Sequence, residues 1–158
     1  MKRLKRRGLK VGSECKIYNT YIDYGHCFLI EIGNNVTISN STLLAHDAST
    51  KTFLGKTKIG KIKIEDNVFI GWGSIILPNV KIGSNVIIGA GSVVNKDIPS
   101  GSIVAGVPAT IIGQTNDFID KNKEWMSVSP VYDKPWKKKT KNEIMLMKEQ
   151  IEIFGYDD

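Results

Sequence analysis

Two histidines are the side chains of this sequence best suited to transfer a proton, because an imidazole changes its charge near neutral pH. His46 lies between Ala45 and Asp47, and His26 lies earlier in the chain. We expect His46 to project from a turn and to act as a general base, and His26 to be structural. Asp47 is the first candidate to orient the imidazole of His46. The alternatives that His46 is an ordinary surface residue, or that it bonds a loop carbonyl, remain open at this point.

A strict period of six residues indicates which elements must position these side chains. Branched aliphatic residues recur at the first place of each hexad, and small or aliphatic residues recur at the fifth place. The first places are Ile32, Ile38, Leu44, Ile64, Ile70, Ile76, Ile82, Ile88 and Val94, and the fifth places are Val36, Thr42, Ala48, Val68, Ser74, Val80, Val86, Ser92 and Ile98. An α-helix would need spacings of three and four, and an isolated strand a spacing of two. The pattern therefore predicts a short strand and a turn, repeated.

One such unit cannot bury its inward side chain alone, so the units must stack. Glycine and asparagine occupy turn places, as at Gly33, Asn35 and Asn67, where the backbone bends tightly. In these features the sequence resembles the hexapeptide-repeat acyltransferase family. The resemblance implies an all-β fold, a left-handed parallel β-helix with three hexads in each coil, over residues 11–112. We expect it to carry one inserted loop and to be followed by a C-terminal α-helix.

The inserted loop is located by the spacing of the hexads. Ile32 and Ile64 begin similar hexads, but they lie further apart than one coil of three hexads allows, and the excess falls at about residues 50–63. This loop carries five lysines and no acidic residue: Lys51, Lys56, Lys58, Lys61 and Lys63. The sequence leaves two interpretations open, a solvated excursion or a flap over an anionic ligand.

The hexad pattern stops after Ile112, and residues 113–158 form a C-terminal extension. We expect residues 116–133 to be irregular. Thr140 and Glu143 have the spacing of a capping box, which predicts a helix over about residues 141–154. One face of this helix would carry Ile144, Met147, Ile151 and Phe154, with Gly155 as its stop. Packing against the end of the coil or against a neighbouring subunit is its expected role, ahead of contact with a membrane surface.

Ala45-His46-Asp47 is similar to the catalytic-histidine segment of sugar O-acetyltransferases of the maltose, galactoside and capsule or lipopolysaccharide type. The later segments 68–74, 76–83, 89–99 and 106–109 resemble the acetyl-CoA-binding half of those enzymes. The resemblance makes acetyl-CoA the co-substrate, and we assign to its binding Gly71, Trp72, Gly73, Ser74, Ala90, Gly91, Lys96, Pro108 and Thr110. Thr110 departs from the family, which commonly has a basic residue there, so Lys96 or the loop lysines are candidates to contact a CoA phosphate instead.

The early coils resemble the acceptor-binding region of the same family and suggest Asn19, Asp23 and Tyr24 as substrate contacts. Trp72 occupies a turn place, where its ring is expected either to pack against the cofactor or to close a contact between subunits. The resemblance also implies a homotrimer with active sites between subunits.

The predicted function is acetyl-CoA-dependent O-acetyl transfer to a hydroxyl of a sugar or surface-polysaccharide unit, directly and with His46 as base. The amine of an amino sugar, serine or an antibiotic hydroxyl are alternative acceptors. A non-catalytic β-helix that serves as an assembly scaffold is the alternative of another class. A metallohydratase like the γ-class carbonic anhydrases would need three histidines as ligands, and only two are present. We therefore expect no metal requirement.

The net charge of +6 comes from 22 basic and 16 acidic residues, and six of the basic residues lie within residues 1–10. The remainder of the chain is neutral. We therefore expect a solvated basic tail over residues 1–10, no nucleic-acid partner, and at most weak contact of the tail with a membrane surface. No apolar segment follows the basic start as it would in a signal peptide, which predicts a cytoplasmic location.

Overall fold

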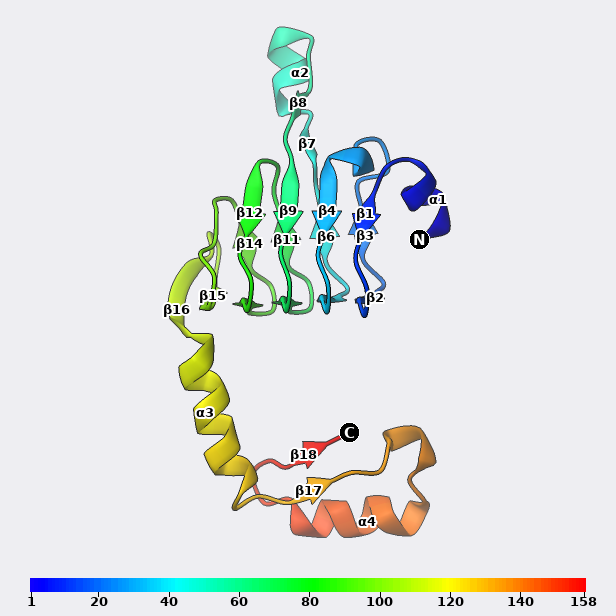
Figure 1. Ribbon diagram of the computed structural model, residues 1–158, viewed down its shortest axis with the longest axis vertical. Helices are drawn as coiled ribbons and strands as arrows, with labels where there is room; N and C mark the ends of the chain where they lie inside the picture. The colour runs from blue at the N-terminus through cyan, green and yellow to red at the C-terminus, as the bar shows by residue number, and fades with distance from the viewer. The chain divides into compact units, whose positions relative to one another are not determined.

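The computed structural model describes all residues from 1 to 158. Two compact units divide the chain, Met1–Thr115 and Asn116–Asp158. The first unit is a column of stacked short strands (Figure 1). The second unit is built mainly from helices, and each unit is described here by itself.

Three parallel sheets form the sides of the first unit. The first sheet runs in the order β1 (Lys10–Val11), β4 (Ile30–Ile32), β9 (Ile62–Ile64) and β12 (Val80–Ile82). The second runs in the order β16 (Thr110–Gln114), β15 (Ser102–Ala105), β13 (Ile87–Ile88), β10 (Phe69–Ile70), β5 (Thr37–Ser39) and β2 (Lys16–Tyr18). The third runs in the order β14 (Val93–Val94), β11 (Ile75–Ile76), β6 (Thr42–Leu43) and β3 (Tyr21–Ile22). This arrangement confirms the predicted left-handed parallel β-helix of hexad repeats.

The repeating aliphatic residues fill the interior of the column. The registers align Ile32 with Ile64 and Ile64 with Ile82 in the first sheet. Ile70 pairs with both Ile38 and Ile88 in the second sheet. All first-place residues from Ile64 to Val94 are buried, as are the fifth-place residues from Val68 to Ile98. Burial of stacked branched side chains is thus the main stabilising term of this unit.

The upstream hexad frame is wrong at one place. Leu43, not Leu44, is fully buried and pairs with Ile76. Thr42 is only half-buried and Ala48 is exposed, so neither occupies an inward fifth place. The corner between β5 and β6 is one residue shorter than a strict period of six requires, which shifts every later residue up to the insertion by one place.

Stacked asparagines close one corner of the column. Asn35, Asn67 and Asn85 have positive φ angles of 50°, 56° and 57°, a conformation that asparagine tolerates better than most residues. The side-chain amide of Asn35 donates to Asn67 at 2.9 Å, and that of Asn67 donates to Asn85 at 3.1 Å. The turn residues suggested by the sequence therefore form a hydrogen-bonded ladder along the column.

The inserted segment is a hairpin that projects from the column (Figure 1). Strand β7 (His46–Asp47) pairs antiparallel with β8 (Lys58–Ile59), and α2 (Ser49–Leu54) joins them. The predicted loop boundaries of about 50 and 63 are therefore displaced, because β9 already begins at Ile62. The insertion starts at the strand that carries His46.

The first ten residues are not a free tail. Helix α1 (Lys2–Arg6) is exposed on most sides, but Leu4 packs against the core and Leu9 is buried. Gly8 has a φ of 101°, and a Cβ atom there would lie 2.8 Å from Cβ of Phe28. Only glycine fits both this backbone and this contact. The basic segment therefore closes one end of the column, with its charges outward.

The second unit contains the predicted capped helix and one further helix. The segment expected to be irregular forms α3 (Thr115–Met126). Thr140 and Glu143 make the reciprocal capping box at the start of α4 (Lys141–Gln150). That helix ends four residues earlier than predicted, and Phe154 instead packs against Trp125, with ring centroids 5.2 Å apart. The remaining elements are β17 (Val131–Tyr132), η2 (Trp136–Lys138) and β18 (Tyr156–Asp157).

None of the helices is both long enough and apolar enough to cross a bilayer. The predicted boundaries at residues 10 and 112 also differ from the structure, since β1 begins at Lys10 and β16 ends at Gln114. Strand β16 pairs antiparallel with β15 and thereby covers the last parallel edge of the second sheet.

Candidate active site

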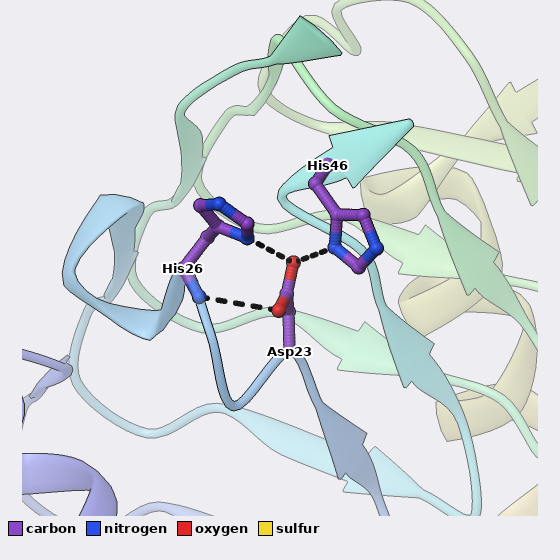
Figure 2. Close-up of side chains that lie close together, drawn as sticks. All are labelled: Asp23, His26 and His46. Carbon is purple, nitrogen blue, oxygen red and sulfur yellow. Dashed lines mark hydrogen bonds and ion pairs between the residues drawn. The ribbon is translucent and has the colours of Figure 1, made fainter. Parts of the chain in front are cut away.

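His46 and Asp23 form a hydrogen-bonded pair at one corner of the column. Strand β3 pairs with β6, so Ile22 lies beside Leu43, and the residues after these two strands turn the same corner in adjacent coils. Asp23 follows β3, and His46 follows β6 at the base of the hairpin. The carboxylate oxygen Oδ2 of Asp23 accepts a hydrogen bond from Nδ1 of His46 (Figure 2). Stacking of coils thus brings together two residues that are distant in sequence.

The carboxylate of Asp23 is held rigidly by backbone amides. Its Oδ1 accepts from the amides of Gly25 at 3.1 Å and His26 at 3.2 Å, and its Oδ2 also accepts from the amide of Ala45 at 3.2 Å. Only 1% of Asp23 is exposed. Burial raises the pKa of this carboxyl, but the hydrogen bonds from His46 and from the His26 backbone outweigh burial and bring the pKa below its ordinary value. Asp23 is therefore ionised at neutral pH.

An ionised partner at Nδ1 decides which nitrogen of His46 can act as a base. Because the Asp23 carboxylate only accepts hydrogen bonds, Nδ1 carries the proton of the neutral His46 imidazole and Nε2 carries its lone pair. The side chain of His46 is 30% exposed, and Nε2 points away from Asp23 (Figure 2). The geometry therefore suits removal of a proton from a bound hydroxyl or amine.

Asp47 does not orient His46, contrary to the sequence-based expectation. Its carboxylate accepts instead from the backbone amide of Ser49 at 2.9 Å. Hydrogen bonds to Ser49 are also the main reason that the pKa of Asp47 lies below its ordinary value. Adjacent residues of a strand point to opposite faces, so a residue next to His46 in β7 is poorly placed to bond its ring.

The residues predicted to contact the acceptor divide between two corners. Asn19, with a φ of 44°, forms the exposed turn between β2 and β3, at the other end of β3 from Asp23. Tyr24 lies beside Asp23 and is exposed. The guanidinium carbons of Arg3 and Arg7 lie 4.8 Å and 4.4 Å from the centre of the Tyr24 ring. Of the three predicted residues, Asp23 contacts His46, whereas the ring of Tyr24 contacts the two arginines.

Most of the predicted cofactor residues line a different corner. Trp72 precedes β11, whereas His46 follows β6, and these two strands are neighbours in the third sheet. The amide of Gly91 donates to the carbonyl of Trp72 at 2.8 Å, and the amide of Val93 donates to the carbonyl of Gly106 at 3.0 Å. Three successive coils thus place their turns in one row. Within a single chain this row and His46 lie at opposite ends of the strands of the third sheet.

The predicted cofactor residues divide into exposed residues, which a cofactor can contact, and buried residues, which have a structural role. Trp72 is 66% exposed, and six others are at least partly exposed: Gly73, Ala90, Gly91, Lys96, Pro108 and Thr110. Ser74 is fully buried and donates its hydroxyl to the carbonyls of Gly71 and Gly89. Gly71 is also buried, and a Cβ atom there would lie 2.6 Å from the amide nitrogen of Ala90. Ser74 and Gly71 therefore serve the packing of coils and are removed from the set of cofactor contacts.

Sequence reasoning missed the pairing of Asp23 with His46. A signal for it was present, because Ile22 and Leu43 pair in consecutive coils, and Asp23 and His46 follow these two residues within the same corner. The shift of the frame at Leu43 and the short helix η1 (Cys27–Leu29), which lengthens the intervening coil, concealed this correspondence. The contacts of Arg3 and Arg7 with Tyr24 could not be inferred, since the basic segment was expected to be a solvated tail.

A groove of about 320 Å³ in the second unit holds no predicted site residue. Val131, Tyr132, Leu146 and Met147 are among the residues that line it. Its position between α4 and β17 makes it a feature of that unit alone. The histidine corner in the first unit remains the place where chemistry-bearing side chains converge.

Comparison with known proteins agrees with this fold. Residues 61–96 match the family described as Bacterial transferase hexapeptide (six repeats). Protein CapG of Staphylococcus aureus is 42% identical over 83 residues, which is 48% of each chain, so the present chain spans about half the length of this curated relative.

Two solved structures extend the similarity to most of the column. A galactoside acetyltransferase in complex with coenzyme A is 32% identical, covers 74% of this chain and is itself covered over 70% of its length, with a TM-score of 0.56. A maltose O-acetyltransferase from Clostridium difficile 630 is 33% identical, with coverage of 70% and 72% and a TM-score of 0.50. With its stacked hexads and these relatives, the chain belongs to the hexapeptide-repeat acyltransferase family.

Proposed function

We propose that this protein is an acetyl-CoA-dependent O-acetyltransferase that modifies a hydroxyl of a sugar or surface-polysaccharide unit. The observation that carries the proposal is the Asp23–His46 pair, a buried ionised carboxylate behind a partly exposed imidazole. Asp23 also holds backbone amides, but a scaffold would not need its further hydrogen bond to a partly exposed imidazole. The related galactoside acetyltransferase binds coenzyme A, which supports acetyl-CoA as donor.

The proposed reaction is a direct transfer. Nε2 of His46 takes the proton from the acceptor hydroxyl as its oxygen attacks the thioester carbonyl carbon of acetyl-CoA. The C–S bond then breaks, the acetyl group stays on the acceptor oxygen, and the departing sulfur receives the proton from His46. Asp23 stabilises the imidazolium that exists between these steps and keeps Nδ1 protonated throughout.

A homotrimer is the proposed assembly. One chain leaves His46 and the Trp72 row at opposite ends of the strands of the third sheet. A strand together with the turn residues at its two ends spans about 17 Å at 3.3 Å per residue. A neighbouring copy would bring its own row of turns beside His46. Exposed aromatic rings at the edges of the column, those of Tyr21 and Trp72, support such a contact.

Coenzyme A provides the first test. A ligand at 100 times its Kd stabilises the folded state by about 2.7 kcal/mol, so coenzyme A should raise the melting temperature by on the order of 5–10 °C. His46→Ala should keep this shift and lose acetyl transfer. An unchanged melting temperature of the wild-type protein at saturating coenzyme A would favour the scaffold.

The acceptor is the second question. A thiol-release assay with sugars, amino sugars, serine and antibiotic hydroxyls compares the proposed acceptor with the alternatives. Transfer to an amine alone would replace the O-acetyltransferase with an N-acetyltransferase and leave the role of His46 intact.

We also propose weak contact of α1 with an anionic membrane surface, since its charges face outward. Deleting residues 2–7 is an unsuitable test, because Leu4 packs against the core. Replacing Lys2, Lys5 and Arg6 with glutamine leaves that packing in place. Unchanged binding to vesicles that contain phosphatidylserine would argue against the contact. The cytoplasmic location remains a prediction.

A further inference from the structure

One ring nitrogen beside the Asp23–His46 pair has no hydrogen-bond partner. Nδ1 of His26 is inaccessible to solvent and makes no hydrogen bond. It lies 3.5 Å from Oδ2 of Asp23, within the range of an ion pair, but makes no hydrogen bond to it. Buried polar atoms are nearly always satisfied in native proteins. A buried nitrogen left without a hydrogen bond beside a carboxylate therefore indicates a group bound between the two that the chain itself does not supply.

Three donor atoms converge on the same point. Oδ2 of Asp23 and one ring nitrogen each of His26 and His46 all lie within 4.8 Å of one another. Figure 2 shows both Nδ1 atoms directed at Oδ2. The centres of the two imidazole rings are 5.1 Å apart. Two imidazoles and one carboxylate are a ligand set of zinc sites that keep an open position.

The fit to a zinc ion requires only small movements. At Zn–N and Zn–O distances of about 2.0–2.2 Å, tetrahedral ligands lie about 3.3 Å apart. Nδ1 of His46 must therefore withdraw from Oδ2 of Asp23, and ligand atoms that lie up to 4.8 Å apart must approach one another by up to about 1.5 Å. The side chains of His26 and His46 are 31% and 30% exposed, so they are not enclosed on all sides, while the backbone amides on Oδ1 hold the carboxylate in place.

We propose that Asp23, His26 and His46 form a binding site for Zn²⁺ or a similar divalent ion, and that the bound ion inhibits acetyl transfer. A neutral imidazole carries one proton, so coordination through Nδ1 of His46 moves that proton to Nε2. Nε2 then has no lone pair with which to accept the proton of the acceptor. The ion thus inactivates the base by changing the tautomer of His46. Inhibition rests on the proposed function, whereas binding of the ion does not.

Binding is tested without an activity assay. Titration of the metal-free protein with Zn²⁺ in a calorimeter should give one site per chain, and Co²⁺ should develop visible d–d absorption. His26→Gln removes one ligand and should weaken Zn²⁺ by at least about tenfold, whereas His26→Cys supplies another zinc ligand and should restore binding. Cys15→Ser is the matched control, because Cys15 is a free, partly exposed thiol outside the site. It should bind Zn²⁺ like the wild type.

Inhibition is measured as the ratio of activity with Zn²⁺ to activity after chelation, within each variant. Wild type and Cys15→Ser should lose activity with Zn²⁺ and regain it with chelator, and His26→Gln should be at least about tenfold less sensitive. Equal zinc affinity and equal sensitivity of wild type and His26→Gln would overturn the site, as would the absence of zinc binding by an active wild type. Metal binding by a protein without any transferase activity would refute the proposed function and leave the metal site standing.

Discussion

Replacing Asp23 with asparagine tests the proposed role of the carboxylate behind His46. The two carboxylate oxygens accept four hydrogen bonds, two at Oδ1 from the amides of Gly25 and His26 and two at Oδ2 from Ala45 and His46. Asparagine offers one oxygen and one NH₂ group. If its oxygen accepts the hydrogen bonds from the amides of Gly25 and His26, its NH₂ group, which is itself a donor, faces the donors of Ala45 and His46.

In the Asp23→Asn protein, the change that costs the least free energy is a move of the His46 ring proton from Nδ1 to Nε2. Its Nδ1 then accepts a hydrogen bond from the new NH₂ group, and Nε2 carries the proton. The base is lost although both rings stay in place. General-base catalysis contributes about 10²–10⁴-fold, and an inverted tautomer removes most of it, so we expect kcat to fall about 10³-fold. The amide of Ala45 also loses a charged acceptor, at a cost of about 1.5–3 kcal/mol in unfolding free energy.

The assay is steady-state acetyl transfer combined with denaturant unfolding of the same preparations. Asp47→Asn makes the same chemical change one residue from His46, where the carboxylate accepts a hydrogen bond from Ser49 and none from His46. We expect its kcat to remain close to that of the wild type. A folded Asp23→Asn protein that retains kcat within tenfold of wild type would refute the tautomer argument. Equal losses in both variants would show that charge near His46, and not the hydrogen bond, determines the rate.

Three further predictions concern the stability of the fold. The pKa of Asp23 is lower in the folded state than its ordinary value of 3.8, so the ionised carboxylate stabilises the fold above pH 3.8. This contribution should disappear as the pH falls through the lower pKa of the folded state. The unfolding free energies of wild type and Asp23→Asn, measured by urea titration, should therefore converge in acid and not in base. Gly71→Ala should lower the unfolding free energy by about 1–3 kcal/mol, because its Cβ atom would press on the backbone of Ala90, and an unchanged urea midpoint would show that the coils can separate without cost. Thr140→Ala should destabilise the second unit by about 1 kcal/mol through loss of the capping box with Glu143, which circular dichroism of urea-induced unfolding would detect; an equal effect of Thr140→Ser, which keeps the hydroxyl, would contradict a capping role.

Much of the first unit was predictable because one physical requirement repeats along it. Each coil must present a branched aliphatic side chain to the same interior, so the period of six marks the strands, and asparagine at positive φ marks a corner. Where a corner was shortened, before Leu43, the period alone misplaced the frame by one residue. The helix α3 was missed because its residues carry no comparable repeat, and its stability depends on contacts that the local sequence does not display.

The candidate site shows the same division. The sequence by itself singled out His46, since few side chains change charge near neutral pH and this one follows the hexads at a turn. Only the tertiary structure selected Asp23 over Asp47 as its partner and placed His26 beside them. The physical reason is that stacking aligns residues one coil apart, whereas neighbours along a strand point to opposite sides. Chemical type can be read along the chain, but the direction in which a side chain points is decided by the coil against which it packs.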